Sequence, residues 1–594
     1  MSLPLRDLHK IDGESFDYMY EENASIVLSR TKGLVRCNVF RPKAAPGDRF
    51  PVLVTYGPYG KDVHYSIFHA SSFAEVPAEH HSPHSAWETP DPGFWTKQGY
   101  ALVRADEVGL GQSPGVLNTM SRDTSLAFAD VVEWAADQPW STGKVGLLGI
   151  SYYAGSQWRV AARRPKGLEC IIPWEGMSDY YRDRCRHGGI LSNTFIDFWW
   201  NRQVIVNQYG RTGRAARRWG SDTLECELSE EVLRQNCHDQ NEENAANHFL
   251  DDEYYASRDF DLSDIQVPLL SVGNWGGILL HLRGNVEGFK YAGSKLKYLR
   301  FVTGRHDLPF YTAACVDLQK SFLDAFLKGV DPEGWTTGIP PRVGYRVRVG
   351  DVGYNDTAAD AAYPERYQSD WPLPDTKYTK YFLTADRGLI NTSPGKMDET
   401  SHITYRALGE LSSQQLVQFT SEPFPQETEF TGHIMAHLNV SVTADPSGST
   451  PSDIDLFLTL RHLNAKGKEI LYTGTVGDPV PITKGWLRCS LRAVNSSHPR
   501  HSPWQPYREY SSTEKSPLVP GEIYAVDVEV WPTNVVMLPG ERLVFEVSSG
   551  DTQGAGIFEH NSKADRDEAT FAGNNHIHFG EGRENWVLMP VVPS

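Results

Sequence analysis

Three scarcities in this sequence each exclude a class of protein: few cysteines, no long apolar run and no excess of basic residues. The seven cysteines form no Cys-x-x-Cys pair, which is typical of reduced thiols in a cytosolic chain and not of a disulfide framework. They stand at positions 37, 170, 185, 226, 237, 315 and 489. No run approaches the roughly 18 apolar residues of a membrane helix, and the first residues, MSLPLRDLHKIDGESF, lack the apolar core of a signal peptide. We therefore expect a soluble, cytoplasmic protein.

The charge balance is acidic. Lys and Arg number 57 against 75 Asp and Glu, which gives a net charge of −18. Nucleic acids and anionic membranes both attract a positive surface on their partner. We therefore expect neither of them as a partner. The sequence does not set the oligomeric state, and a homodimer stays open.

The order of apolar segments predicts an α/β domain followed by an all-β domain. Over the first 310 residues, short β-branched runs alternate with helical stretches such as 125–138, which is typical of a parallel sheet covered on both faces. From about residue 373, apolar and polar residues alternate with a period of two between Gly, Pro and Asp turns. This pattern predicts a β-sandwich or jelly roll over 373–594. The expected strands of the parallel sheet are 51–56, 100–105, 144–150, 168–173, 267–272 and 297–302.

The strand pattern lapses between about 176 and 262, where Arg, Trp, Tyr and Asn are frequent and 191–210 has helical spacing. We expect this insertion to form a mostly helical cap, because ligand sites of open sheets lie at the carboxyl ends of the strands. A separate helical bundle packed elsewhere is the alternative. The catalytic domain then comprises 1–175 and 263–372.

Two serines compete for the role of a nucleophile. The run GQSPG, Gly111–Gly115, matches the simple Gly-x-Ser-x-Gly pattern, but Ser113 is followed by Pro114, which has no N–H to donate to an oxyanion. Ser151 lies between an apolar strand and a helix in KVGLLGISYYAGSQW, and Tyr152 after it has a free N–H. We therefore predict Ser151 as the nucleophile, with a helix N-cap as the alternative role of its hydroxyl.

Several motifs carry a resemblance to a known family. GISYYAGSQW followed by PKGLECIIPWEGMSDYYRD, the earlier PVLVTYGPYGKD and the later GRHDLPFYTAACVDLQKSFLDAFLKG occur in the order expected there. SDIDLFLTL and LPGERLVFEVSS extend the similarity into the carboxyl half. The chain resembles the cocaine-esterase / X-Pro dipeptidyl-peptidase family of serine hydrolases. This resemblance implies an α/β-hydrolase domain with a helical cap, followed by a jelly-roll, galactose-binding-like C-terminal domain.

The resemblance also implies roles for individual residues. Ser151 stands at the position of the nucleophile, and His306 stands at that of the general base, in a loop after the last strand. An imidazole suits this role because its pKa lies near neutrality. Tyr59, in GPYGKD, matches a tyrosine whose hydroxyl joins the oxyanion hole, and the second donor would be the N–H of Tyr152.

The sequence departs from the family where the acid is expected. A motif of the type Trp-x-Asp-Gly is replaced by WGGI at 275–278, and no carboxylate occurs from 265 to 286. Glu175 is our candidate acid, because it follows the strand next to the nucleophile strand and because triads are defined by geometry, not by chain order. Asp179, a Ser–His dyad and an inactive triad stay open.

The remaining aromatic and histidine clusters receive simpler interpretations. The segment 69–90 contains His69, His80, His81 and His84, but prolines interrupt it and neither a cysteine nor a His-Glu-x-x-His helix is present, so we expect a loop at the pocket mouth. We expect no metal and no cofactor. The residues expected to line the substrate pocket are Trp174, Phe198, Trp199 and Trp275.

These features favour a serine hydrolase that cleaves an ester or amide of a small, largely apolar molecule through an acyl-enzyme. An acyl transferase or cyclase that uses the same acyl-enzyme is the first alternative. An X-Pro dipeptidyl-peptidase activity and a non-catalytic ligand-binding protein are the others. The X-Pro activity needs a carboxylate clamp for a free amino end, which the sequence does not reveal.

Overall fold

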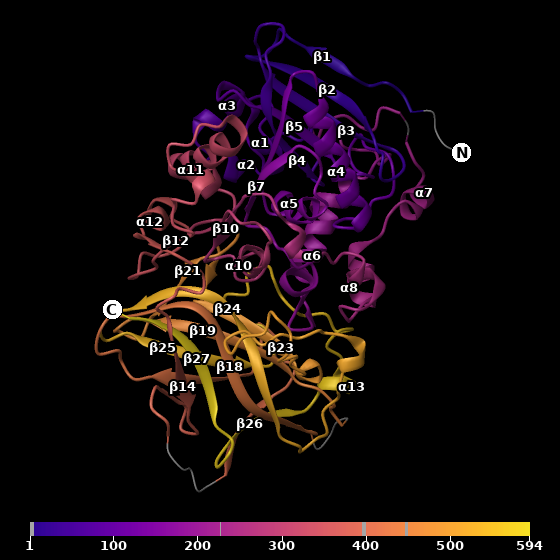
Figure 1. The fold of residues 1–594 in the computed structure, drawn as a ribbon. Coiled ribbons are helices and arrows are strands. Elements are labelled where there is room, and N and C mark those ends of the chain that lie inside the picture. The colour runs from indigo at the N-terminus through magenta and orange to yellow at the C-terminus, as the bar shows by residue number, and fades with distance from the viewer. Residues whose placement is uncertain (1–4, 226, 395–399, 446–449, 594) are drawn as a thin grey trace.

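The N-terminal half is built on one 11-stranded sheet (Figure 1). The computed structural model describes residues 5–225, 227–394, 400–445 and 450–593. The strands are β1 (Lys10–Asp12), β2 (Tyr18–Val27), β3 (Leu34–Pro42), β4 (Phe50–Gly57), β5 (Ala101–Asp106), β6 (Ser141–Ile150), β7 (Leu168–Trp174), β10 (Leu269–Asn274), β11 (Lys297–Val302), β12 (Val343–Arg346) and β13 (Glu365–Gln368). Their spatial order is β1-β2-β3-β5-β4-β6-β7-β10-β11-β12-β13. All six strands predicted for this sheet are confirmed.

The sheet is parallel only in its middle. Neighbours from β5 through β4, β6, β7, β10 and β11 to β12 run parallel. The edges are antiparallel: β1–β2, β2–β3 and β3–β5 on one side and β12–β13 on the other. The six strands predicted for the parallel sheet do run parallel to one another, and the antiparallel edge strands lie outside that predicted set. Short connections, such as that between β2 and β3, allow only antiparallel neighbours, whereas parallel pairs need a crossover.

Helices cover both faces of this sheet, as the apolar strand sequences require. The helix predicted at 125–138 is confirmed as α4 (Arg122–Asp137), and it packs with α5 (Tyr152–Ala162) in one apolar cluster. On the other face, α3 (Pro92–Lys97) and α11 (Ala313–Leu323) contribute to a second cluster. Strands buried on both faces carry near-continuous apolar runs. The carboxyl ends of β6, β7, β10 and β11 therefore lie together at one edge.

The insertion between β7 and β10 consists of short helices and turns. Its helices are α6 (Thr194–Trp199), α7 (Glu230–Gln235), α8 (Gln240–Ala246) and α9 (Glu253–Ala256), and its π-helical turns are η2 (Tyr181–Cys185) and η3 (Trp200–Val204). Aromatic side chains of this segment pack against Tyr59, Tyr152 and Tyr153 at the carboxyl ends of β4 and β6. The insertion therefore covers the predicted nucleophile.

The C-terminal half is a β domain whose strand ladder closes on itself. Its main strands are β14 (Lys377–Leu383), β15 (Gly388–Ile390), β16 (Ser401–Arg406), β17 (Leu416–Ser421), β18 (Thr428–Thr443), β19 (Asp455–Leu463), β23 (Thr483–Arg488), β24 (Tyr524–Met537), β25 (Arg542–Ser548), β26 (Asn574–Phe579) and β27 (Asn585–Val592). The ladder runs β18-β24-β23-β19-β25-β17-β15-β14-β27 and returns by the pairing of β27 with β18. Such closure leaves no exposed edge in this ring.

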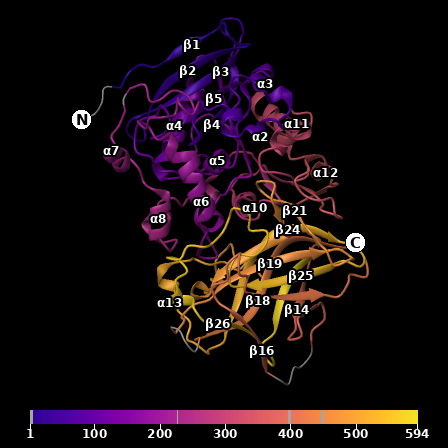
Figure 2. The ribbon, with the colours of Figure 1, turned by 180° about the vertical axis from the view of Figure 1, so that it is seen from behind.

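The two halves meet next to the carboxyl ends of the parallel strands. Both views place α10 (Leu282–Tyr291) and β21 (Tyr472–Thr473) at this boundary (Figure 2). A single apolar cluster runs from Trp275 and α10 into the β domain. The N–H of His306 donates to the carbonyl of Thr475, at 3.1 Å. The β domain therefore holds the loop that carries the predicted base.

Two global features complete the fold. Six of the seven cysteines are free thiols, and Cys226 lies outside the described residues. Within the described ranges, no helix combines the length and apolar character that crossing a membrane would need.

Candidate active site

Ser151 sits on a strained turn between β6 and α5. Its backbone has φ 59° and ψ −116°, a region that residues other than glycine rarely occupy. Its N–H donates to the carbonyls of Trp174 and Glu175, both at 3.1 Å, and its side chain makes no cap hydrogen bond to α5. The hydroxyl is therefore not used to end its own helix, and this geometry is typical of a nucleophile elbow.

Ser113 has a structural role. Its hydroxyl accepts the N–H of Arg36 and donates to the carbonyl of Asp106, both at 2.9 Å. The side chain is fully buried. Ser113 therefore ties β3 to the loop after β5.

The partner of Ser151 is a histidine that the sequence reasoning missed. Ser151 Oγ lies 3.1 Å from His281 Nε2, and His281 Nδ1 accepts the N–H of Met177, also at 3.1 Å. Because Nδ1 accepts, Nε2 carries the proton of the neutral ring and donates to Oγ. Burial lowers the pKa of His281 well below its usual value, and the charges of His306 and Arg184 lower it further. The signal was present, since His281 lies in the run WGGILLH where the acid was sought.

His306 lies between two carboxylates. Its Nδ1 is 2.9 Å from Glu175 Oε2, and its Nε2 is 3.1 Å from Glu88 Oε1. Burial disfavours the charged ring, but Glu175 and then Glu88 outweigh burial and raise the pKa of His306 to about 10. The ring lies almost parallel to that of His281, with centroids 5.2 Å apart. The structure therefore pairs His306 with Glu175, but it does not place His306 in hydrogen-bond contact with Ser151.

Glu175 stands where an acid can replace the missing aspartate. It follows β7 with φ 48°, its N–H donates to the carbonyl of Val272 at 2.7 Å, and its Oε1 accepts from Asn274 Nδ2 at 3.1 Å. A Cβ built on Gly277 would lie 3.6 Å from Glu175 Oε2. The carboxylate of Glu175 therefore fills the space beside position 277, where the family motif has its aspartate.

The other carboxylate considered from the sequence, Asp179, is engaged elsewhere. Asp179 accepts from Arg182 Nη1 at 2.6 Å. Within the described chain, no contact joins Asp179 to His306. Asp179 is therefore not placed as the partner of the base.

Glu88 is a second group that the sequence reasoning missed. Its side chain is buried, its Oε2 has no hydrogen-bond partner in the described structure, and its backbone has φ 59°. Burial raises the pKa of Glu88 to about 7, although the hydrogen bond to His306 opposes this shift. Its carbonyl accepts the N–H of Ile150 at 3.0 Å, which fixes it beside the elbow. Its sequence signal was its place within the His-rich segment 69–90 expected at the pocket mouth.

Two donors flank the elbow. The hydroxyl of Tyr59 accepts from Trp199 Nε1 at 3.0 Å, which leaves its own proton available. Burial raises the pKa of Tyr59 well above its usual value, so this phenol stays neutral. Tyr152 opens α5, and the first N–H groups of a helix have no partner within the helix. The two donors expected for the oxyanion hole thus come from residues around Ser151.

Of the four side chains predicted to line the pocket, only that of Trp199 contacts the site among the described residues, through Tyr59 and Tyr152. Phe198 is 48% exposed, because it lies on the outer side of α6. Trp275 stacks on Phe301 at 3.9 Å and donates to the carbonyl of Arg346, so it belongs to the core between the domains. Trp174 is fully buried in the sheet core.

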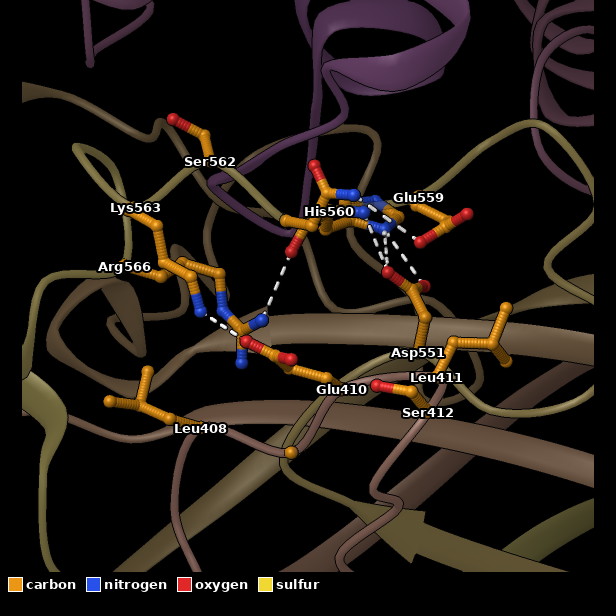
Figure 3. Close-up of a pocket in the computed structure, with 12 residues that line it drawn as sticks. Leu408, Glu410, Leu411, Ser412, Asp551, Glu559, His560, Ser562, Lys563 and Arg566 are labelled. Carbon is orange, nitrogen blue, oxygen red and sulfur yellow. Dashed lines mark hydrogen bonds and ion pairs between the residues drawn. The ribbon is translucent and has the colours of Figure 1, made fainter.

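A cavity of about 630 Å³ lies in the C-terminal half and is lined mostly by polar and charged residues (Figure 3). None of the predicted site residues lines it. His560 there is bound at Nδ1 by Asp551, at 3.0 Å, and at Nε2 by His187, at 2.8 Å. Neither nitrogen of His560 is free, so this ring is not available as a base.

A serine on a strained strand–helix turn of a largely parallel sheet, beside a histidine–carboxylate pair, is the arrangement of α/β serine hydrolases. Residues 33–306 match the X-Pro dipeptidyl-peptidase (S15 family), and residues 338–588 match the X-Pro dipeptidyl-peptidase C-terminal non-catalytic domain. The chain belongs to this family of serine hydrolases.

Similar proteins agree with this assignment over most of the chain. The cocaine esterase of Rhodococcus sp. is 24% identical over 636 residues, covering 97% of this chain and 99% of the relative. A putative serine esterase of Mycobacterium bovis is 25% identical over 534 residues, covering 76% and 78%. The crystal structure of a CocE/NonD family hydrolase from Staphylococcus aureus superposes with a TM-score of 0.80 at 27% identity, covering 98% and 96%.

Proposed function

We propose that this serine hydrolase cleaves an ester or amide of a small molecule through an acyl-enzyme on Ser151. The observation that carries the proposal is the strained turn at Ser151. Its hydroxyl makes no hydrogen bond to its own helix and lies 3.1 Å from Nε2 of His281. Oγ attacks the carbonyl carbon, and the bond to the leaving alcohol or amine breaks. Water then hydrolyses the acyl-enzyme, which releases the acid and restores Ser151.

We assign the role of general base to His306, with Glu175 as the acid that orients it. Glu175 on Nδ1 leaves Nε2 to accept the proton of Ser151, as in a Ser-His-acid triad. His281 is the weaker candidate, because the N–H of Met177 occupies its Nδ1 and directs its proton toward Ser151. In the arrangement described, Glu88 occupies Nε2 of His306. Catalysis therefore requires Glu88 to release this nitrogen.

The oxyanion would accept from the hydroxyl of Tyr59 and the N–H of Tyr152. Donors that are fixed before the reaction stabilise the developing charge without reorganisation. Trp199 holds the Tyr59 oxygen, which orients the hydroxyl proton. The closed ladder of the C-terminal half is compatible with the jelly roll implied by the family, and we propose that this domain supports the His306 loop.

Hydrolysis is tested by turnover of p-nitrophenyl butanoate in water enriched in ¹⁸O. We expect one ¹⁸O atom in each butanoate released, because water attacks the acyl carbon of the acyl-enzyme. Mass spectrometry of the product measures this, and incubation without protein gives the background. Burial of Ser151, which is 8% exposed, favours acyl transfer as a second candidate. The butanoate ester of an added alcohol as the main product would support transfer over hydrolysis, and unlabelled free butanoate would contradict an acyl-enzyme resolved by water.

Glu88→Gln is expected to extend the activity to lower pH. The reaction needs neutral His306, so activity rises with pH through the pKa of this ring. Glu175 and Glu88 raise that pKa to about 10 against the effect of burial. Removing the negative charge of Glu88 lowers the pKa of His306, so we expect the acidic midpoint to fall by about one pH unit or more. The rate at which a fluorophosphonate labels Ser151, measured from pH 5 to 11, gives this midpoint.

Glu79→Gln is the matched control for this variant. Glu79 is an exposed carboxylate on the same segment, and it should leave the profile unchanged. An unchanged or higher midpoint in Glu88→Gln would show that Glu88 does not stabilise protonated His306.

A further inference from the structure

Arg184 is a buried guanidinium without an acid. It lies on the π-helical turn η2 of the insertion and is 4% exposed. Its Nη1 donates to Gln240 Oε1 at 2.9 Å, whereas its Nη2 has no hydrogen-bond partner in the described structure. Two nearby arginines of the same segment do have an acidic partner: Arg182 pairs with Asp179, and Arg186 pairs with Asp565. No ion pair of the described residues includes Arg184, although buried charges are normally paired.

Gln240 adds a second unused donor beside the first. Its Oε1 accepts from Arg184, from Thr119 at 3.3 Å and from Tyr180 at 3.2 Å. This fixes the orientation of the amide, and its Nε2 then has no acceptor among the described residues. Two buried donors without an acceptor, on side chains that are hydrogen-bonded to each other, fit an anion that supplies two oxygens.

The ring of Trp199 links Arg184 to Tyr59 and Tyr152, the two residues assigned to the oxyanion hole. The Cζ of Arg184 is 4.5 Å from the centroid of Trp199, whose Nε1 donates to the hydroxyl of Tyr59. Trp199 also stacks on Tyr152, with centroids 5.7 Å apart. The charge of Arg184 reaches the site itself, since it lowers the pKa of His281. The aromatic faces partly compensate the charge of Arg184 but accept none of the in-plane N–H bonds.

We propose that Arg184 and Gln240 bind a carboxylate of the substrate, so that the molecule cleaved at Ser151 carries a negative charge at a distance from its reacting carbonyl. This inference rests on the proposed function, because it uses the same site. It refines the expected largely apolar substrate to one with an apolar body and an anionic end. An unpaired buried charge destabilises the free protein, and a ligand that pairs with it explains why it is kept.

Binding to the Ser151→Ala variant tests the proposal without turnover. The probes are the monomethyl esters of succinate, glutarate and adipate, each compared by calorimetry with its dimethyl ester, which differs by one charge. We expect at least one monomethyl ester to bind at least about tenfold more tightly than its dimethyl ester. Adding Arg184→Gln should remove this preference while binding of the dimethyl ester is retained. Arg184→Lys should keep part of it, because the positive charge remains.

Arg202→Gln is the control for charge, since Arg202 is an exposed arginine of the same insertion. It should keep the preference. Equal binding of both esters at all three lengths, or a preference that survives Arg184→Gln, would overturn the anion site. Fluorophosphonate labelling of wild-type Ser151 tests the hydrolase separately. Labelling without a charge preference rejects the anion site alone, and a preference without labelling rejects the hydrolase alone.

Discussion

Ser151→Ala is expected to abolish both turnover and active-site labelling. The variant removes the atom that forms the acyl bond, so turnover of p-nitrophenyl butanoate should fall by about 10⁴-fold or more. A fluorophosphonate should no longer attach to the protein, as judged by intact mass. The fold should persist, because among the described residues the Ser151 hydroxyl bonds only to His281, and its N–H bonds are made by the backbone.

Ser113→Ala is the matched control for this result. It removes the hydroxyl of the serine in GQSPG, which matches the Gly-x-Ser-x-Gly pattern more closely than the surroundings of Ser151 do. This variant should keep both labelling and turnover. Labelling that is lost in Ser113→Ala and kept in Ser151→Ala would reverse the assignment of the nucleophile.

His306→Ala is expected to reduce turnover by about 10³- to 10⁴-fold, whereas His281→Ala should reduce it by only about tenfold. Glu175 holds Nδ1 of His306, so once Glu88 releases Nε2 this ring can take a proton there and stabilise the resulting charge. His281 has a lowered pKa and donates to Ser151, which suits positioning better than proton transfer. Steady-state kinetics and the labelling rate measure both variants.

Glu175→Gln completes this comparison. Loss of its charge should lower turnover to nearly the same extent as loss of His306, because residues of a triad act as a unit. Asp179→Asn, which changes the other carboxylate considered, should leave the labelling rate close to that of the wild type. A larger loss in His281→Ala than in His306→Ala would make His281 the base. An effect of Glu175→Gln below about tenfold would argue against its role as the acid.

Local sequence determined the parts of the fold that depend on local physics. The six sheet strands and α4 follow from apolar periodicity, which acts over a few residues. Ser151 could be predicted because its turn needs neighbours of a particular size and an N–H immediately after it. Glu175 could be proposed because parallel strands bring their carboxyl ends to one edge, whatever their order along the chain.

The rest of the site depends on contacts between distant segments. Glu88 meets His306 across 218 residues, and His281 meets Ser151 across 130. No periodicity encodes these pairings, because Glu88, His281 and His306 lie in loops whose paths are set by packing. The same limit explains the misplacement of Phe198 and Trp275, since composition indicates an aromatic cluster but not which ring turns inward.

The contact between the β domain and the histidine loop also constrains how this chain could be divided. A side chain at Gly276 would collide with the carbonyl of Thr473, and the N–H of His306 depends on the carbonyl of Thr475. The segment 473–475 thus contacts both the loop after β10, at Gly276, and the loop that carries the predicted base His306. We therefore expect the hydrolase half to depend on these contacts, and an exchanged carboxyl-terminal half would have to provide the same segment.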